Sequence, residues 1–276
     1  MCNSHLYRIL LLTTSILLLI IPTRSQGLLS FAESNGVGSI RCCHDWNPGY
    51  TANPANIFSN AGPLAYLAYS NPFRSELTHN RTVGAVYTRT VDQLGVHAIL
   101  AGSSFYYENL YGLSYGRKLL PNLAIGVQVG AYHHRFSHSN WKAQFTLGMI
   151  YHYTEGGQLG ILISPNPYQI DQESTLSPRN NTINIGVKIP WEERANLYFE
   201  LEKTSGFRLE TKFALDYRLD PSWLLMGGFV YPRKQISFGV HYSHAPFRIQ
   251  FAYQHHWILG ITPSLSIWYH FNHSKP

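Results

Sequence analysis

The sequence is poor in charged residues: Asp, Glu, Lys and Arg make up 13% of its 276 residues, against about 25% in ordinary soluble domains. Beyond the first 25 residues no apolar run is long enough to cross a membrane as a helix. No segment shows a sustained helical stripe of apolar residues either. These absences exclude a helical membrane protein and disfavour a helical soluble domain.

Cysteine is also scarce, with three residues in the chain. Cys42 and Cys43 are adjacent, and neighbouring cysteines rarely reach the geometry of a disulfide, so we interpret both as small, partly buried residues. Aromatic residues, in contrast, make up 14% of the chain and 19 residues are Tyr. Little charge, much Tyr and a mean hydropathy of −0.14 favour β-structure at a membrane interface.

The N-terminus has the composition of a secretory signal peptide. Arg8 precedes an apolar run over residues 9–21, and Thr23 and Ser25 place small residues at −3 and −1 before Gln26. We therefore predict a signal peptide over residues 1–25, the alternative being an uncleaved N-terminal anchor. The remaining chain divides into a plug segment (26–63), a β-domain (64–271) and a short tail (272–276).

From residue 64 onward the apolar pattern has a period of two, which is typical of β-strands. Turn residues such as Gly156-Gly157 and Asp220-Pro221 separate the segments. The pattern predicts fourteen strands, at 64–70, 81–89, 92–100, 110–118, 123–134, 141–153, 156–164, 181–189, 196–203, 208–218, 222–230, 234–243, 246–255 and 264–271.

Most strands have one apolar and one polar face, as in 208–218, where Phe213, Leu215 and Tyr217 oppose Lys212 and Asp216. A soluble sandwich would bury the apolar face, whereas a transmembrane barrel would turn it toward lipid. Most strands have the length needed to span a bilayer, and Trp or Tyr often ends the apolar face. The connections also alternate between long and short, except for a mildly long one at 190–195. These features favour an all-β fold: a transmembrane antiparallel β-barrel in the bacterial outer membrane, with a short N-terminal plug.

Two observations predict that something fills the interior. The strand 222–230 is apolar on both faces, and 92–100 nearly so, which indicates a partly apolar lumen or a wall packed against a plug. In addition, glycines fall in mid-strand, where they relieve crowding or make room for a plug. These glycines are Gly95, Gly126, Gly130, Gly148, Gly186 and Gly239.

The segment TANPANIF at 51–58, the Ser-Asn-Pro-Phe stretch at 70–73 and about fourteen following strands resemble the FadL superfamily of outer-membrane barrels. The likeness covers about residues 45–271 and is greatest with short PorV and PorQ-type members found in Bacteroidetes, which are associated with type IX secretion. It implies that Asn53, Pro54 and Ala55 form part of the plug. This chain departs from the family in its Arg41–His44 segment and in its extension beyond the aromatic Phe271.

Charged residues on the polar strand faces form a second group of candidates, because they would meet inside the barrel and pair across strands. They could brace the wall and grip the plug, or they could form a selectivity or ligand site. This predicted lumen charge network comprises Lys142, Lys188, Glu200, Glu202, Arg208, Glu210, Lys212 and Asp216.

Two functions remain open. The family resemblance favours, as the first of the two functions, a barrel that handles or anchors cargo of a secretion system. The alternative is a passive channel or transporter for small hydrophobic or amphipathic solutes. We expect no enzymatic activity, cofactor, bound metal or nucleic-acid partner, because no residue constellation for them stands out. The expected partners are outer-membrane lipid, with secretion-system proteins, secreted cargo or hydrophobic small molecules as further candidates.

Overall fold

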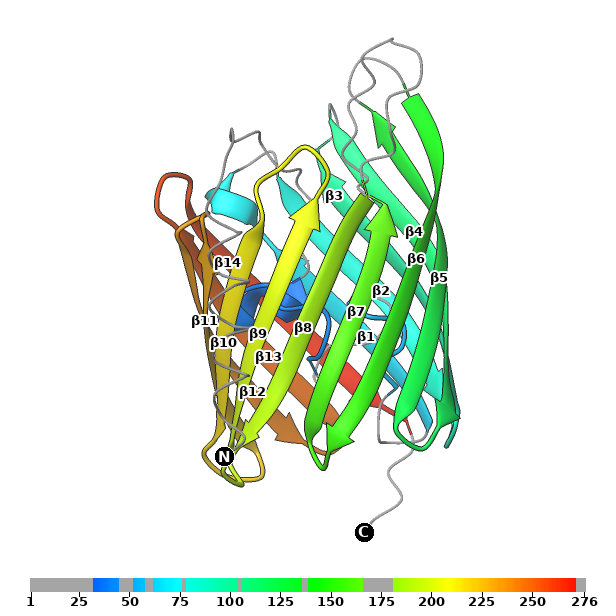
Figure 1. Cartoon of the computed structure of the whole chain (residues 1–276). Helices are drawn as coiled ribbons and strands as arrows, with labels where there is room; N and C mark the ends of the chain where they lie inside the picture. The colour runs from blue at the N-terminus through cyan, green and yellow to red at the C-terminus, as the bar shows by residue number, and fades with distance from the viewer. Residues whose placement is uncertain are drawn as a thin grey trace.

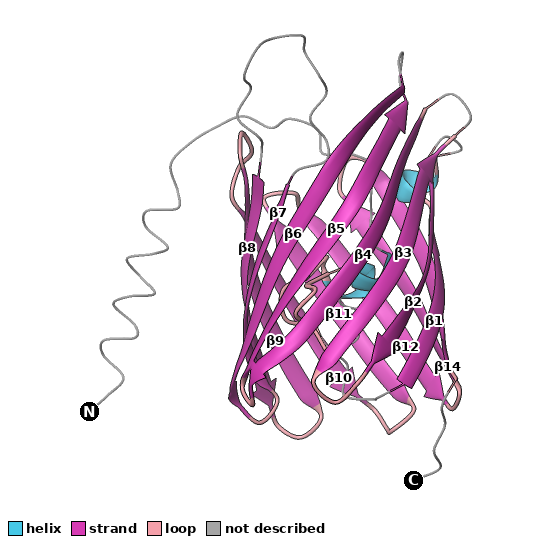
Figure 2. Cartoon of the chain, turned by 90° about the vertical axis from the view of Figure 1, so that its right-hand side faces the viewer, coloured by secondary structure: helices cyan, strands magenta, loops and turns pink. Residues whose placement is uncertain are grey.

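The chain folds into a closed antiparallel β-barrel with an N-terminal segment inside it (Figures 1 and 2). The computed structural model describes residues 32–44, 52–57, 62–75, 78–103, 106–135, 139–165 and 181–271. The predicted signal peptide and C-terminal tail lie outside these ranges. Among the described residues, no helix is both long and apolar enough to cross a membrane.

Fourteen strands build the wall. They are β1 (Gly62–Ser70), β2 (His79–Thr88), β3 (Asp92–Gly102), β4 (Tyr107–Leu120), β5 (Leu123–Arg135), β6 (Ser139–Thr154), β7 (Gly157–Pro165), β8 (Asn181–Trp191), β9 (Ala195–Thr204), β10 (Glu210–Arg218), β11 (Trp223–Tyr231), β12 (Gln235–His244), β13 (Phe247–His256) and β14 (Gly260–His270). Two short 3-10 helices accompany them, η1 (Ala32–Val37) and η2 (Pro72–Arg74).

Each strand pairs with its neighbours in sequence, and β1 pairs with β14 to close the ring. Closure leaves no unpaired strand edge, which a lipid environment requires. The predicted fold class is therefore confirmed, and all fourteen predicted strands are present. The largest shift is at β14, which begins at Gly260 rather than at residue 264, because Ile261, Thr262 and Pro263 already lie opposite β13.

The two faces of the wall invert the arrangement of a soluble domain. In β10, Glu210, Lys212 and Asp216 are buried while Phe213 and Leu215 are exposed. The same alternation recurs around the ring, so apolar side chains cover the outside and polar ones point inward. This is the pattern of a barrel whose exterior faces lipid, and it excludes the soluble sandwich.

The two ends of the barrel differ in their connections. At one end, shown at the bottom of Figure 1, the strands are joined by short turns such as 121–122, 155–156 and 245–246. At the other lie the longer connections 71–78 and 166–180. The expected exception at 190–195 was wrong: β8 continues through Trp191 and β9 starts at Ala195, so this turn is short too. Because outer-membrane barrels carry their longer loops outside, the long-loop end is the extracellular one.

The described part of the N-terminal segment lies against the inner wall. Helix η1 contacts β10 to β14 and β1, and its Val37 packs with Met226 and Leu224 of β11. Residues 40–44 and 52–57 then follow the wall past β9, β8, β7, β6, β5 and β4 to β3. The plug therefore runs around the circumference of the barrel rather than straight along its axis.

Candidate functional site

Asn53 and Pro54 form a tight turn inside the barrel. Asn56 N donates to Asn53 O at 2.9 Å, which closes a β-turn with proline at its preferred second position. The Asn53 side-chain oxygen accepts from Ala55 N at 3.0 Å, and this Asx contact stiffens the turn further. The sequence-predicted plug residues Asn53, Pro54 and Ala55 are all buried within the barrel.

The amide group of Asn53 ties this turn to the wall. Its Nδ2 donates to Met149 O of β6 at 3.3 Å and to Ile161 O of β7 at 3.2 Å. It also lies 3.2 Å from Cys42 O in the preceding part of the plug. Because Asn53 is fully buried, losing this amide would remove buried hydrogen bonds that are worth about 0.5–1.5 kcal/mol each.

Glycines in the wall make room for the plug. A Cβ on Gly148 would overlap the Asn53 side chain, and one on Gly126 would overlap the Pro54 backbone. A Cβ added at Gly186 would lie 2.9 Å from Cys42 Cβ, and one added at Gly239 would lie 2.9 Å from Gly36 Cα. The plug-facing glycines are Gly116, Gly126, Gly148, Gly160, Gly186, Gly228 and Gly239, and we call them the glycine belt. Gly130, which the sequence also suggested, faces the β4 backbone instead.

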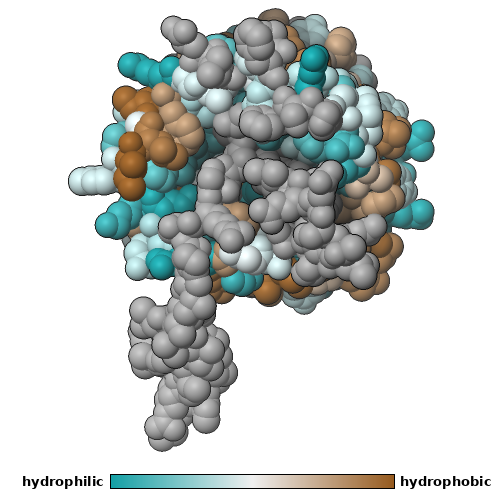
Figure 3. Space-filling model, turned by 90° about the horizontal axis from the view of Figure 1, so that it is seen from above, coloured by the Kyte–Doolittle hydropathy of each residue, from teal (hydrophilic) through white to brown (hydrophobic). Residues whose placement is uncertain are grey.

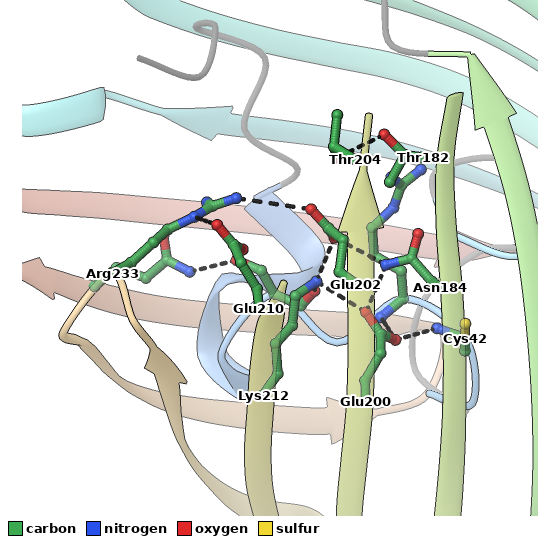
Figure 4. A network of polar contacts seen from close by, with 12 residues as sticks. Cys42, Thr182, Asn184, Glu200, Glu202, Thr204, Glu210, Lys212 and Arg233 are labelled. Carbon is green, nitrogen blue, oxygen red and sulfur yellow. Dashed lines mark hydrogen bonds and ion pairs between the residues drawn. The ribbon is translucent and has the colours of Figure 1, made fainter. Parts of the chain in front are cut away.

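Glu200 of β9 binds the plug backbone directly (Figure 4). Its Oε2 accepts hydrogen bonds from Arg41 N at 2.8 Å and Cys42 N at 2.7 Å. Its Oε1 accepts from Asn184 Nδ2 of β8 at 2.9 Å and from Lys212 Nζ at 2.8 Å. Four donors therefore surround a carboxylate that is fully removed from solvent.

Lys212 of β10 completes the attachment. Its ammonium group donates to Glu200, to Glu202 Oε2 at 2.7 Å and to Ser39 O of the plug at 2.8 Å. An ammonium has three donors, so all of them are used. We call Glu200 and Lys212, with the plug backbone groups that they bind, the plug latch.

The pairing continues from the latch toward the long-loop end. Arg233 Nε lies 2.5 Å from Glu210 Oε1, and its Nη2 lies 3.7 Å from Glu202 Oε1. Arg233 was not among the predicted residues, because it stands in the turn between β11 and β12, outside the alternating pattern of the strands. Glu108 was missed as well: β4 begins at Tyr107, before the predicted start, so Glu108 faces inward, where Tyr106 donates to it.

The other predicted network members do not join this cluster. Arg208 is exposed in the loop before β10 rather than on the strand, because that strand starts only at Glu210. Lys142 is on β6, separated from β9 by β7 and β8. Asp216 belongs to a second group nearer the short-turn end, where it accepts from Asn196 at 2.8 Å and Tyr198 at 2.6 Å. Lys188 is buried opposite Tyr198 in the same region.

The two plug cysteines are free and buried. Burial raises the pKa of the Cys42 thiol well above its ordinary value, and the nearby Glu200 carboxylate raises it further. The thiol therefore stays neutral near pH 7. Among the described residues, no cluster of three or more His, Cys, Asp or Glu side chains could hold a metal ion.

The inner wall away from the latch carries apolar side chains. Near the long-loop end, Ile99, Ala101, Leu110 and Tyr132 of β3 to β5 form one cluster. Toward the short-turn end, Leu64, Tyr66, Val86 and Trp268 of β1, β2 and β14 form another. We call these the outer and inner apolar clusters.

No family model and no curated protein matches this sequence. Among solved structures, the fold is similar to the CymD monoaromatic hydrocarbon channel, with a TM-score of 0.68 and 14% identity over 91% of this chain and 100% of that one. It is also similar to the Pseudomonas putida toluene transporter TodX, with a TM-score of 0.62 and 10% identity over 88% and 97% of the two chains. The Acinetobacter baumannii outer membrane protein Omp33 has a TM-score of 0.53 and 10% identity over 76% and 98%.

The protein is an integral outer-membrane β-barrel. The closed ring, the apolar exterior and the likeness to outer-membrane channels establish this, and they confirm the predicted location. The barrel type agrees with the resemblance to the FadL superfamily. The finer likeness to PorV and PorQ, with its link to type IX secretion and Bacteroidetes, gains no support from these structures.

Proposed function

We propose that this barrel is a passive channel for small hydrophobic molecules across the outer membrane. The observation that carries the proposal is the outer apolar cluster: four apolar side chains on the inward face of β3 to β5, where a barrel for charged or strongly polar solutes would carry polar groups. Two of the solved structures of similar fold are a monoaromatic hydrocarbon channel and a toluene transporter, which supports the same substrate class. On this proposal the protein is not an enzyme.

The charges inside the barrel fit this function because they are already committed. Glu200, Glu202 and Lys212 satisfy one another and the plug backbone, so they are poorly suited to replace the hydration shell of a passing ion. Apart from Glu108, which accepts a hydrogen bond from Tyr106, much of the inner wall on the opposite side, from β1 to β5, is apolar or neutral. A small hydrophobic molecule would lose little by moving from lipid or water to such a surface.

A pair of register partners allows a sharp test. Ile99 of β3 and Thr82 of β2 lie opposite each other, and both are buried on the inner face. Ile99→Asn would place an amide in the outer apolar cluster, at a cost of about 1–3 kcal/mol for a passing apolar solute or for the site itself. Thr82→Asn is the matched control, because it puts the same side chain at the same height where a polar group already stands.

The measurement is the initial rate of radiolabelled toluene uptake by cells whose own hydrocarbon channels have been deleted. We expect the wild type and Thr82→Asn to restore uptake and Ile99→Asn to lower it by about fivefold or more. Heat-modifiable gel mobility checks that each variant is folded. Toluene uptake no higher than in cells without the protein would refute the proposal, and a co-purifying secreted protein would then favour cargo handling.

A further inference from the structure

The exposed charges of the described residues differ between the two ends of the barrel. Among the residues that the structure describes, the exposed acidic side chains at the short-turn end are Glu155, Glu192, Glu193 and Asp220. Exposed basic residues stand beside them there, among them Arg117, Arg194 and Arg218. The described exposed charges at the long-loop end are Arg74, Arg81, Arg135, Lys203, Arg208 and Lys234, while Glu76, Asp171 and Glu173 of the loops at this end lie outside the described ranges. Figure 3 looks onto this end, where hydrophilic side chains project around the rim.

Three of these cations stand on the lipid-facing side of the wall rather than in loops. Arg81 of β2 lies opposite Tyr69, Arg135 of β5 opposite Tyr107, and Lys203 of β9 opposite Ile183. All three are exposed and belong to the outward-facing set of their strands. They are spread around the ring, on strands that are not neighbours. We call Arg81, Arg135 and Lys203 the outer cation ring.

Amphipathic aromatic side chains mark the height of this ring. Tyr69 stacks on His79 and shares a hydrogen bond of 2.7 Å with its Nδ1. His133 stacks on Trp141, with ring centroids 4.0 Å apart and planes 2° from parallel. Because Trp and Tyr gather where the hydrocarbon layer meets the headgroups, cations beside them lie at headgroup depth. Arg81 is opposite Tyr69, and Arg135 is two residues beyond His133 on the same face.

We propose that the outer cation ring binds the phosphate groups of the phosphorylated glycolipid in the outer leaflet. Two observations carry this inference: all three cations face lipid, and Arg81 and Arg135 lie beside aromatic side chains of the kind that mark the headgroup boundary. Arg is well shaped for phosphate through paired N–H donors, and Lys binds it as a point charge. The short-turn end carries exposed acidic side chains beside its cations and serves as the comparison. The inference goes beyond the channel function and does not depend on what the channel carries.

The test is stabilisation of the folded barrel by lipid. Purified protein in uncharged detergent with EDTA is heated, and the fraction that keeps its fast gel mobility gives an unfolding midpoint. The probes are diphosphoryl lipid A, chemically dephosphorylated lipid A and inorganic phosphate. At about 100 times its dissociation constant, a ligand of the folded state raises such a midpoint by about 5–10 °C. We expect that rise with diphosphoryl lipid A alone, and we expect added salt to reduce it.

Matched triple variants locate the site. The variant Arg81→Gln, Arg135→Gln, Lys203→Gln should lose more than half of the lipid-dependent rise. The control Arg117→Gln, Arg194→Gln, Arg218→Gln removes three exposed charges from the short-turn end and should keep the rise. If the first triple variant does not fold, the three single variants replace it, each with a partial loss.

Four results would overturn the inference. They are an equal rise with dephosphorylated lipid A, an equal rise with inorganic phosphate, an unchanged rise in the outer-ring variants, and an equal loss in the short-turn control. The second would indicate a site for free anions rather than for lipid headgroups.

Discussion

The two halves of the barrel interior share the same strand architecture but carry different kinds of inward-facing side chains. On the side of β8 to β10, charged residues face inward and hold the plug through Glu200 and Lys212. On the side of β1 to β5, the inward residues other than Glu108 are largely apolar or neutral and include the outer and inner clusters. The first half fixes a segment of the chain in place, while the second carries the apolar side chains on which the proposed channel function rests. The plug spans both, because its Asn56 carbonyl accepts from Gln93 of β3.

The largest expected effect comes from breaking the charged half. Lys212→Met would leave Glu200 buried without a cation and Glu202 with only the 3.7 Å contact to Arg233, and breaking a buried ion pair in this way costs about 3–5 kcal/mol. We therefore expect a large drop in the midpoint of heat-modifiable unfolding. The control is Lys203→Met on the neighbouring strand, where the lysine is exposed and contributes little to stability. Equal midpoints for the two variants would mean that the latch does not stabilise the protein.

An intermediate effect is expected from filling the glycine belt. Gly148→Val would drive a side chain into Asn53, and such overpacking costs about 1–3 kcal/mol. Because the plug can move more easily than the closed wall, we expect it to be displaced, with faster swelling of proteoliposomes in small sugars.

The matched control for this change is Gly227→Ala, since a Cβ there would lie 3.8 Å from Ser237 O, an ordinary van der Waals contact. It should swell like the wild type. If proteoliposomes with Gly148→Val swell as slowly as those with the wild type, the turn at Asn53 does not close the pathway.

The smallest effect concerns Cys42. Its pKa in the folded protein is raised above the ordinary value of 9.0, so above about pH 9 the unfolded chain loses the thiol proton more readily than the folded one. The folded state then binds more protons, and stability falls as pH rises through this range. Cys42→Ala should make the decline in unfolding midpoint between pH 8 and 10 shallower. An unchanged slope would assign the decline to other groups.

The fold was predictable from the sequence because residues along a barrel strand alternate between the lipid-facing side and the inner side. The local sequence alone indicates which side chains face lipid, as in the alternation of Lys212, Phe213, Ala214, Leu215 and Asp216. No information about distant parts of the chain is needed. The lumen charges Glu200, Glu202, Glu210 and Lys212 were found for the same reason. Arg208 was misplaced because a strand end is the least certain part of such a pattern.

The latch could not be predicted, because its key partners are backbone groups. The identities of Arg41 and Cys42 do not indicate that their backbone N–H groups donate to a carboxylate about 160 positions later in the chain. Arg233 contacts Glu202 and Glu210 from a turn, where the alternating strand pattern does not apply. The choice between cargo handling and a channel depended on resemblance alone, and the period of the strands says nothing about it.

The position of the plug also constrains how the molecule is made. The plug precedes β1 in the chain, yet it lies within a ring whose last seam joins β1 to β14, and η1 contacts both of those strands. Once that seam has formed, the segment cannot enter sideways through the wall. The N-terminal segment must therefore either lie inside the sheet before β1 meets β14 or enter afterwards through an end of the barrel, so closing the wall and seating the plug are coupled steps.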